Sequence, residues 1–247
     1  MSRSLREGIS KEFYRTTAAR SHVASREYYD RAADGLLRRL QSWLPRDRDA
    51  RCVDLACGCG ELLYLLERER FRNIAGVDLC KEELDQARVH VRGELVCADV
   101  LDYLRGSQPH SVDLLTALNF LEHLPKDGLL AILTEARRVL RPCGVLVAMV
   151  PNAVSPFGAL TRHWDMSHEW AFTVNNFWQL ASLTRFSAEV EFRECGPVPH
   201  GVLSGARWVL WQIIRAGISI WLLVEMGGLR GGIYTMDMLV RLRVPGK

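Results

Sequence analysis

The feature that most constrains the fold is an apolar segment at 51–56 that runs directly into a turn containing Gly58 and Gly60. Glycines at a strand-to-helix turn let the backbone approach a ligand closely. The next apolar segment ends at Asp78, where a carboxylate can bind a pair of ribose hydroxyls. This spacing predicts a nucleotide-type site at the carboxyl end of a parallel sheet.

The turn lacks one element of the dinucleotide-binding fingerprint. Glu61 and two leucines follow Gly60, so the third glycine of that fingerprint is absent. The third glycine lets the helix pack closely behind a bound pyrophosphate, and its absence therefore argues against NAD or FAD. Asp54 precedes the loop instead, and an acidic residue at this position favours a ligand with a cationic end.

Apolar strands and amphipathic helices alternate along most of the chain. We expect strands at 51–56, 73–78, 94–97, 112–117, 144–150, 188–195 and 233–243, and helices at 25–43, 60–69, 81–90, 127–140 and 174–185. Alternation of this kind implies parallel strands joined by right-handed crossovers. The predicted fold class is therefore α/β, with a doubly wound, Rossmann-like sheet of seven strands.

The same patterns divide the chain into four regions. Residues 1–45 are expected to form an N-terminal helical arm or cap, and residues 46–200 the core. Residues 201–232 are expected to form a hydrophobic helical insertion, and residues 233–247 supply the last strand of the core. A chain of 247 residues is long enough for one well-cored domain with such an insertion.

Charge and cysteine content narrow the class of protein. The net charge is only +3 and the arginines form no dense block, so nucleic acid is not an expected partner. The seven cysteines and the lack of a signal-peptide pattern predict reduced thiols in a cytoplasmic protein. Cys57 and Cys59 lack a second pair with zinc-ligand spacing, so no metal is expected.

Five segments follow one another in the order found in the class I S-adenosylmethionine-dependent methyltransferases. They are Asp54-Leu-Ala-Cys-Gly-Cys-Gly60, Ile74-Ala-Gly-Val-Asp78-Leu79, Cys97-Ala-Asp99-Val100, Asp113 through Leu124, and Ala136 through Leu146. The chain resembles this family over roughly residues 25 to 197 and departs from it at Cys143, where a glycine is common. The resemblance implies S-adenosyl-L-methionine as the cofactor and a last strand that runs antiparallel to its neighbours.

The resemblance also implies which residues bind the donor. The methionine end would lie against Asp54, Ala56, Gly58 and Gly60, the ribose against Asp78, the adenine amino group against Asp99 and the adenine ring against Leu79 and Val100, with Asn119 as a further binding residue. Two of these residues have a structural alternative. Asp54 can satisfy turn amides at the end of its strand, and Asp99 can cap a helix that begins at Val100.

His123 follows the fourth predicted strand and faces the donor's methyl group if the resemblance holds. An unperturbed imidazole titrates at about pH 6.5, so it can accept the proton of an acceptor hydroxyl. We therefore expect His123 to be the catalytic general base. The alternative is a structural histidine, because a single histidine is more often structural than catalytic.

The segment Asp165-x-x-His168-Glu-x-x-Phe-Thr173 resembles methyltransferases of glycan, lipopolysaccharide and cell-surface polysaccharide synthesis. This resemblance implies O-methylation of a sugar or glycan hydroxyl on a free or lipid-linked acceptor. Asp165 and His168 are expected to be catalytic as a base dyad, with binding of sugar hydroxyls, binding of a divalent ion or a helix cap as alternatives. Methylation of a phenolic or natural-product hydroxyl and a non-catalytic donor-binding scaffold are the other functions left open.

Residues 208–226 are rich in Trp, Ile and Leu, and the polar residues among them form one narrow stripe when the segment is helical. A membrane span is not expected, because Arg215 near the centre would cost about 2.5–3.5 kcal/mol and the last strand would lie across the bilayer from its sheet. The alternatives are a helix packed over the sheet, a homodimer contact, or peripheral contact with a membrane or lipid-linked acceptor. Tryptophan suits the last of these, and the tryptophans are Trp208, Trp211 and Trp221.

Overall fold

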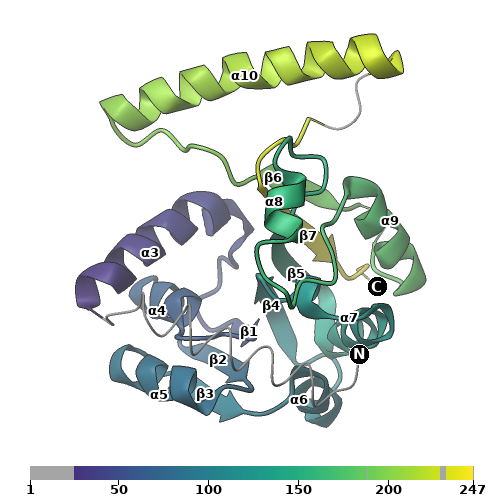
Figure 1. The fold of residues 1–247 in the computed structure, drawn as a ribbon. Helices are drawn as coiled ribbons and strands as arrows, with labels where there is room; N and C mark the ends of the chain where they lie inside the picture. The colour runs from purple at the N-terminus through teal and green to yellow at the C-terminus, as the bar shows by residue number, and fades with distance from the viewer. Residues whose placement is uncertain (1–24, 188, 229–231, 247) are drawn as a thin grey trace.

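The computed structural model describes residues 25–187, 189–228 and 232–246 (Figure 1). Most of the expected N-terminal arm, residues 1–24, lies outside the described residues. The helices are α3 (Arg26–Leu40), α4 (Glu61–Arg68), α5 (Lys81–His90), α6 (Val100–Gly106), α7 (Lys126–Val139), α8 (Gly158–Arg162), α9 (Val174–Leu183) and α10 (Val202–Met226), with the 3-10 turns η2 (Gln41–Trp43) and η3 (Leu121–His123). The strands are β1 (Arg51–Leu55), β2 (Asn73–Asp78), β3 (Glu94–Cys97), β4 (Val112–Leu118), β5 (Leu140–Pro151), β6 (Glu191–Glu194) and β7 (Asp237–Arg243).

These strands form one seven-stranded sheet in the order β3-β2-β1-β4-β5-β7-β6. The first five strands pair in parallel, whereas β7 is antiparallel to both β5 and β6. The predicted doubly wound sheet with an antiparallel last strand is confirmed. The strand order reverses between β1 and β4, and a ligand of such a sheet binds beyond the carboxyl ends of the strands at this point.

Alternating side chains of each central strand pack into two separate apolar layers, because successive residues of a strand point to opposite faces. On β1, Val53 and Leu55 pack with residues of α6, α7 and α9, whereas Cys52 packs with residues of α3, α4 and α5. Figure 1 shows these two groups of helices on the two faces of the sheet. The core therefore holds the central strand ends in fixed positions.

The last strand begins later than expected. The strand pattern predicts a start at residue 233, but β7 begins at Asp237. The side-chain amide of Asn152, the residue after β5, donates to the carbonyls of Ile233 and Thr235, at 2.9 Å each. These two bonds hold the segment before β7 beside the end of β5.

The hydrophobic insertion is a helix of 25 residues, α10, none of which is buried. Figure 1 shows α10 lying apart from the two helical layers, next to the end of the sheet that carries β6 and β7. The alternative in which this helix packs over the sheet is therefore not found. By length and composition α10 could cross a membrane.

Candidate active site

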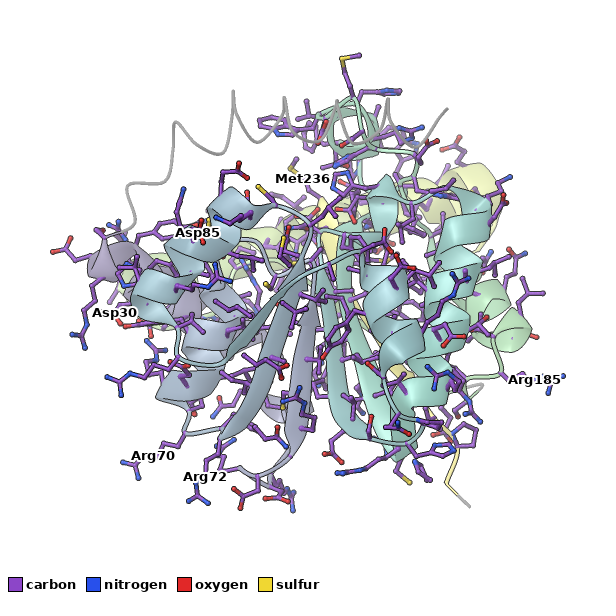
Figure 2. The ribbon with its side chains drawn as sticks, turned by 90° about the horizontal axis from the view of Figure 1, so that it is seen from below. Asp30, Arg70, Arg72, Asp85, Arg185 and Met236 are labelled. Carbon is purple, nitrogen blue, oxygen red and sulfur yellow. The ribbon has the colours of Figure 1, made fainter. Side chains whose placement is uncertain are left out.

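A cavity of about 910 Å³ lies beyond the carboxyl ends of β1, β4 and β5. Figure 2 shows Met236, which lines this cavity, at one end of the strands and Arg70 and Arg72 at the opposite end. Of the predicted site residues, the cavity brings together Asp54, Ala56, Gly58, Asn119, His123, Asp165 and His168. Its lining does not include Gly60, Asp78, Leu79, Asp99 or Val100. The predicted methionine end and the predicted catalytic residues thus share one space.

The loop between β1 and α4 is shaped by backbone in the left-handed region. Ala56, Gly58 and Gly60 have φ values of 56°, 51° and 82°, a conformation that glycine adopts without strain. A Cβ atom at Gly60 would lie 3.1 Å from the side chains of Ala87 and Val91 on and after α5. The loop is therefore packed tightly on α5 and has little freedom to move away from the cavity.

Asp54 is buried at the end of β1, with only 4% of its surface exposed. Thr116 of β4 donates its hydroxyl to Asp54 Oδ1 at 2.6 Å. Burial raises the pKa of this carboxyl to about 7, and the Thr116 hydrogen bond opposes that rise. A buried carboxyl with a single side-chain hydrogen bond, directly on the cavity, suits the cationic end of a ligand.

Asp78 joins two loops. Its Oδ2 accepts the backbone N–H of Gly58 at 2.9 Å, and its Oδ1 accepts that of Cys80 at 2.8 Å. Each carboxylate oxygen has a second lone pair, which leaves capacity for ribose hydroxyls. Leu79 follows it with half of its surface exposed, so a flat apolar ring could cover it. The residues at the end of β2 therefore fit the ribose and adenine of the expected donor.

Asp99 caps α6, as the structural alternative had it. Its Oδ1 accepts the backbone N–H groups of Leu101 at 2.8 Å and Asp102 at 3.3 Å. Val100 is buried in the apolar layer that also holds residues of β2 and β4. The cap fixes the first turn of α6 beside the end of β3, and contact with adenine stays a prediction for both residues.

Helix α3 closes one wall of the cavity and holds the donor loop. The buried Tyr29 donates its hydroxyl to the carbonyl of Cys59 at 2.7 Å, and Tyr28 donates to Glu61 Oε1 at 2.9 Å. Burial raises the pKa of both phenols above their ordinary range, so they stay protonated donors. The expected N-terminal cap is thus tied to the loop by two hydrogen bonds.

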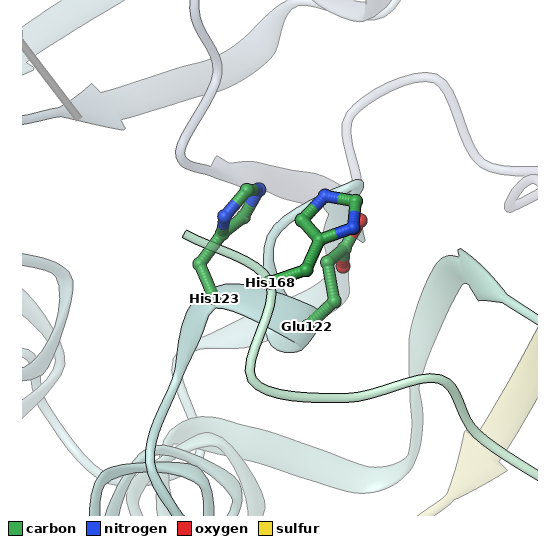
Figure 3. Close-up of side chains that lie close together, drawn as sticks. All are labelled: Glu122, His123 and His168. Atoms are coloured by element: carbon green, nitrogen blue, oxygen red, sulfur yellow. The ribbon is translucent and has the colours of Figure 1, made fainter. Parts of the chain in front are cut away.

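Glu122, His123 and His168 line the cavity and form a compact polar cluster (Figure 3). One ligand atom from each lies within 4.8 Å of the others. Glu122 is 1% exposed, and its Oε2 has no hydrogen-bond partner among the described residues. Burial raises the pKa of Glu122 to about 8. Burial, and then the neighbouring His168, lower the pKa of His123 to about 4.

Both imidazoles are oriented through Nδ1. Ser167 donates its hydroxyl to Asp165 Oδ2 at 2.7 Å, so the Nδ1–H of His123 must donate to Ser167 Oγ, which lies 2.8 Å away. His168 Nδ1 lies 2.9 Å from the carbonyl of Thr161 and donates to it. Because the pKa of His123 is lowered, its ring is neutral and its Nε2 is unprotonated. The structure pairs Asp165 with Ser167 and, through it, with His123, in place of the expected dyad with His168.

Sequence reasoning did not single out Glu122 or Ser167 as site residues. Glu122 lies beside His123 in the motif after β4, and this proximity was an available signal. Ser167 lies between Asp165 and His168 in sequence, but its contact with a residue 44 positions away is a tertiary feature. A carboxylate and two imidazoles could also hold a divalent metal ion. The sequence left a divalent ion open only as an alternative for Asp165 with His168, whereas the structure groups His168 with Glu122 and His123.

The chain matches the sequence model of a family described as "Methyltransferase domain" over residues 25–193. The ubiquinone biosynthesis O-methyltransferase of Neisseria meningitidis serogroup C is 30% identical over 105 residues, which are 40% of this chain and 43% of that protein. The corresponding enzyme of Xanthomonas campestris pv. campestris (strain B100) is 28% identical over 160 residues, 59% of this chain and 65% of that protein. The chain thus spans less than two thirds of the length of these relatives.

Among solved structures, a SAM-dependent methyltransferase from Archaeoglobus fulgidus superposes with a TM-score of 0.63 at 17% sequence identity. The superposition covers 85% of this chain and 94% of that chain. At this identity the similarity shows a shared fold alone.

Proposed function

This chain belongs to the family of S-adenosylmethionine-dependent methyltransferases, and we propose that it transfers the donor's methyl group to a hydroxyl oxygen of a sugar or glycan. The observation that carries the proposal is the single cavity that joins Asp54 to His123. Methyl transfer requires the donor-binding Asp54 and the base His123 to face the same cavity, because the donor carbon and the acceptor oxygen must meet in line at about 3–3.5 Å. The proposal does not depend on where the other predicted site residues lie.

The donor supplies a methyl group on a positively charged sulfur, which leaves as a neutral thioether. The bond that forms joins this carbon to the acceptor oxygen, and the hydroxyl proton passes to Nε2 of His123. Ser167 and Asp165 hold the proton on Nδ1 and so keep Nε2 free to accept. Asp165 also stabilises the imidazolium that forms, as an orienting carboxylate does in other acid–base sites.

A divalent cation is a second candidate for the same task. Three ligand atoms lie within 4.8 Å of one another, and the buried Oε2 of Glu122 has no partner among the described residues. His123 and His168 each donate Nδ1–H to an oxygen, which is the usual support of a metal-bound imidazole. Bound there, a cation would lower the pKa of the acceptor hydroxyl in place of a base.

The sugar acceptor is supported by the resemblance at 165–173 and by the polar cavity wall. The acceptor test uses labelled donor with two panels, polyprenyl-linked glycans and phenols that include quinol precursors. We expect label on the glycans. Label on the phenols alone would move the acceptor to a quinone-type hydroxyl, as the names of the relatives suggest. Donor binding without methyl transfer to any component of a cell extract would instead indicate a non-catalytic donor-binding scaffold.

His123→Ala tests the proton acceptor. We expect donor affinity to stay unchanged and turnover to fall by about 10²–10⁴-fold, the usual contribution of a positioned base. His163→Ala is the matched control, because His163 is exposed and lies just before the same segment. Unchanged turnover in His123→Ala would remove the role.

A further inference from the structure

We propose that α10 is an interfacial helix that lies flat on a phospholipid bilayer and holds the cavity next to the membrane surface. The docking itself does not depend on the proposed function. Its consequence for the acceptor, that a lipid-borne hydroxyl reaches the cavity from the bilayer, does rest on it.

One face of α10 is fastened to the sheet edge by polar contacts. Trp211 donates its indole N–H to Glu194 Oε2 at 2.9 Å, and Arg215 forms an ion pair with Glu194 Oε1 at 3.2 Å. Arg215 also donates to the carbonyl of Gly232 at 2.9 Å, and Ser219 lies 3.2 Å from the hydroxyl of Tyr234. These residues lie at i, i+4 and i+8, so they fix which side of the helix faces the protein.

The opposite face of α10 is continuously apolar and exposed. At 100° per residue, the positions opposite Arg215, the middle of the anchoring stripe, are filled by aliphatic residues, small residues and one tryptophan, with no charged residue among them. The large side chains of this face are 52–90% exposed: Val202, Val209, Leu210, Ile213, Ile214, Ile220, Trp221 and Val224. The helix thus turns its polar stripe inward and its apolar surface to the outside, the reverse of an ordinary surface helix of a globular protein.

The strands on either side of α10 in the chain exclude a membrane span. α10 is preceded by β6 and followed by β7, which pair with each other in one sheet. Residues 227–236 would have to return across the hydrocarbon, and ten residues reach about 33–36 Å when fully extended, little more than a core of about 30 Å. Extended backbone in lipid leaves its N–H and C=O groups unpaired, which is not tolerated. A helix that lies parallel to the surface meets neither obstacle.

The width of the apolar face favours a bilayer over a second copy. A helix pair covers a narrow seam of each partner, whereas the exposed apolar positions from Val209 to Ile214 spread over about 140° on the helical projection. At 1.5 Å per residue α10 is about 37 Å long. A broad apolar face of this length, with Trp221 on it, matches the interfacial helices that insert their apolar side into the headgroup boundary.

The anchor of α10 is continuous along the chain with a wall of the cavity. Gly232 and Tyr234 contact the helix, and Met236 and Asp237, a few residues further, line the cavity. A bilayer in contact with the exposed apolar face of α10 would therefore lie beside the cavity. This placement favours an acceptor whose hydroxyl is carried on a lipid.

Vesicle flotation in the absence of donor and acceptor tests the docking. We expect the full chain to float with phosphatidylcholine vesicles and with vesicles containing anionic lipid, and Ile213→Asp to reduce the bound fraction at least tenfold. Val89→Asp is the matched control, because Val89 is 72% exposed on α5 and should leave flotation unchanged. Ile213 is 64% exposed, so the fold should survive, and donor calorimetry with Ile213→Asp confirms it.

Depth-dependent quenching by brominated lipid gives a second, independent readout. We expect quenching of tryptophan emission on vesicle binding, most of it lost in Trp221→Phe and kept in Trp178→Phe, since Trp178 is exposed on α9. Failure of the wild-type chain to float with either lipid, or equal flotation of Ile213→Asp, would overturn the proposal. A wild-type dimer that Ile213→Asp converts to monomer, without flotation, would replace the bilayer by a second copy. None of these outcomes affects methyl transfer to a soluble acceptor, so the two proposals fail separately.

Discussion

Donor affinity is expected to fall about tenfold from pH 8 to pH 6 through protonation of Asp54. Burial raises the pKa of this carboxyl to about 7, the Thr116 hydroxyl opposes the rise, and Glu61 and Asp78 add to it. Only the carboxylate attracts the cationic end of the donor. With a pKa of about 7, roughly 0.9 of the chains carry the carboxylate at pH 8 and 0.09 at pH 6, and apparent affinity scales with that fraction.

Calorimetric titration with S-adenosylhomocysteine at pH 6, 7 and 8 measures this effect. Asp54→Asn should bind more weakly at pH 8 and show no slope over this range. Glu83 is the matched control, because it lines the same cavity and burial raises its pKa to about 8. Glu83→Gln should keep the roughly fivefold change between pH 6 and pH 7 that Asp54 produces. A flat wild-type affinity, or an undiminished slope in Asp54→Asn, would refute the reasoning.

The pH dependence of the stability of the unliganded protein is a second measure of the Asp54 titration. The unfolded chain releases the Asp54 proton near pH 4, whereas the folded chain keeps it until about pH 7, so stability falls as pH rises through this window. Over three pKa units the loss is at most on the order of 4 kcal/mol. Asp54→Asn should therefore raise the unfolding temperature at pH 8 relative to the wild type, and the gain should shrink toward pH 4.

Ser167→Ala should lower turnover in steady-state assays by about 5–150-fold, equivalent to about 1–3 kcal/mol for the hydrogen bond that orients His123. Calorimetry should show unchanged donor affinity. Turnover equal to that of the wild type would show that Ser167 does not position His123. Dialysis against a chelator should leave turnover intact if His123 is the base, and loss that a divalent metal restores would assign the cluster to a cation. Gly60→Ala should destabilise by about 1–2 kcal/mol, because φ is 82° and the new Cβ meets Ala87 at 3.1 Å. Thermal unfolding should show a loss of about 2–8 °C, whereas Gly35→Ala, with open space around it, should show none.

The sequence predicted the features that depend on neighbours along the chain. Strand and helix periods are set by local backbone sterics, so β2, β3 and α5 appear within the ranges expected for them. The glycine turn at 58–60 and the acidic residue that ends β2 are equally local. The antiparallel direction of β7 came instead from the family resemblance, which the sheet confirms.

Contacts between distant segments could not be read in this way. The Asn152 side chain binds the carbonyls of Ile233 and Thr235 more than 80 positions away. Ser167 joins Asp165 to His123 across 44 positions. Contacts of this kind depend on how the helical layers pack on the sheet. Many segments could reach the same position, and the burial of apolar surface decides which segment does. The exposed placement of α10 has the same origin: composition set its helical, apolar character, but only the Glu194 anchor on the sheet edge decided that its apolar side faces outward.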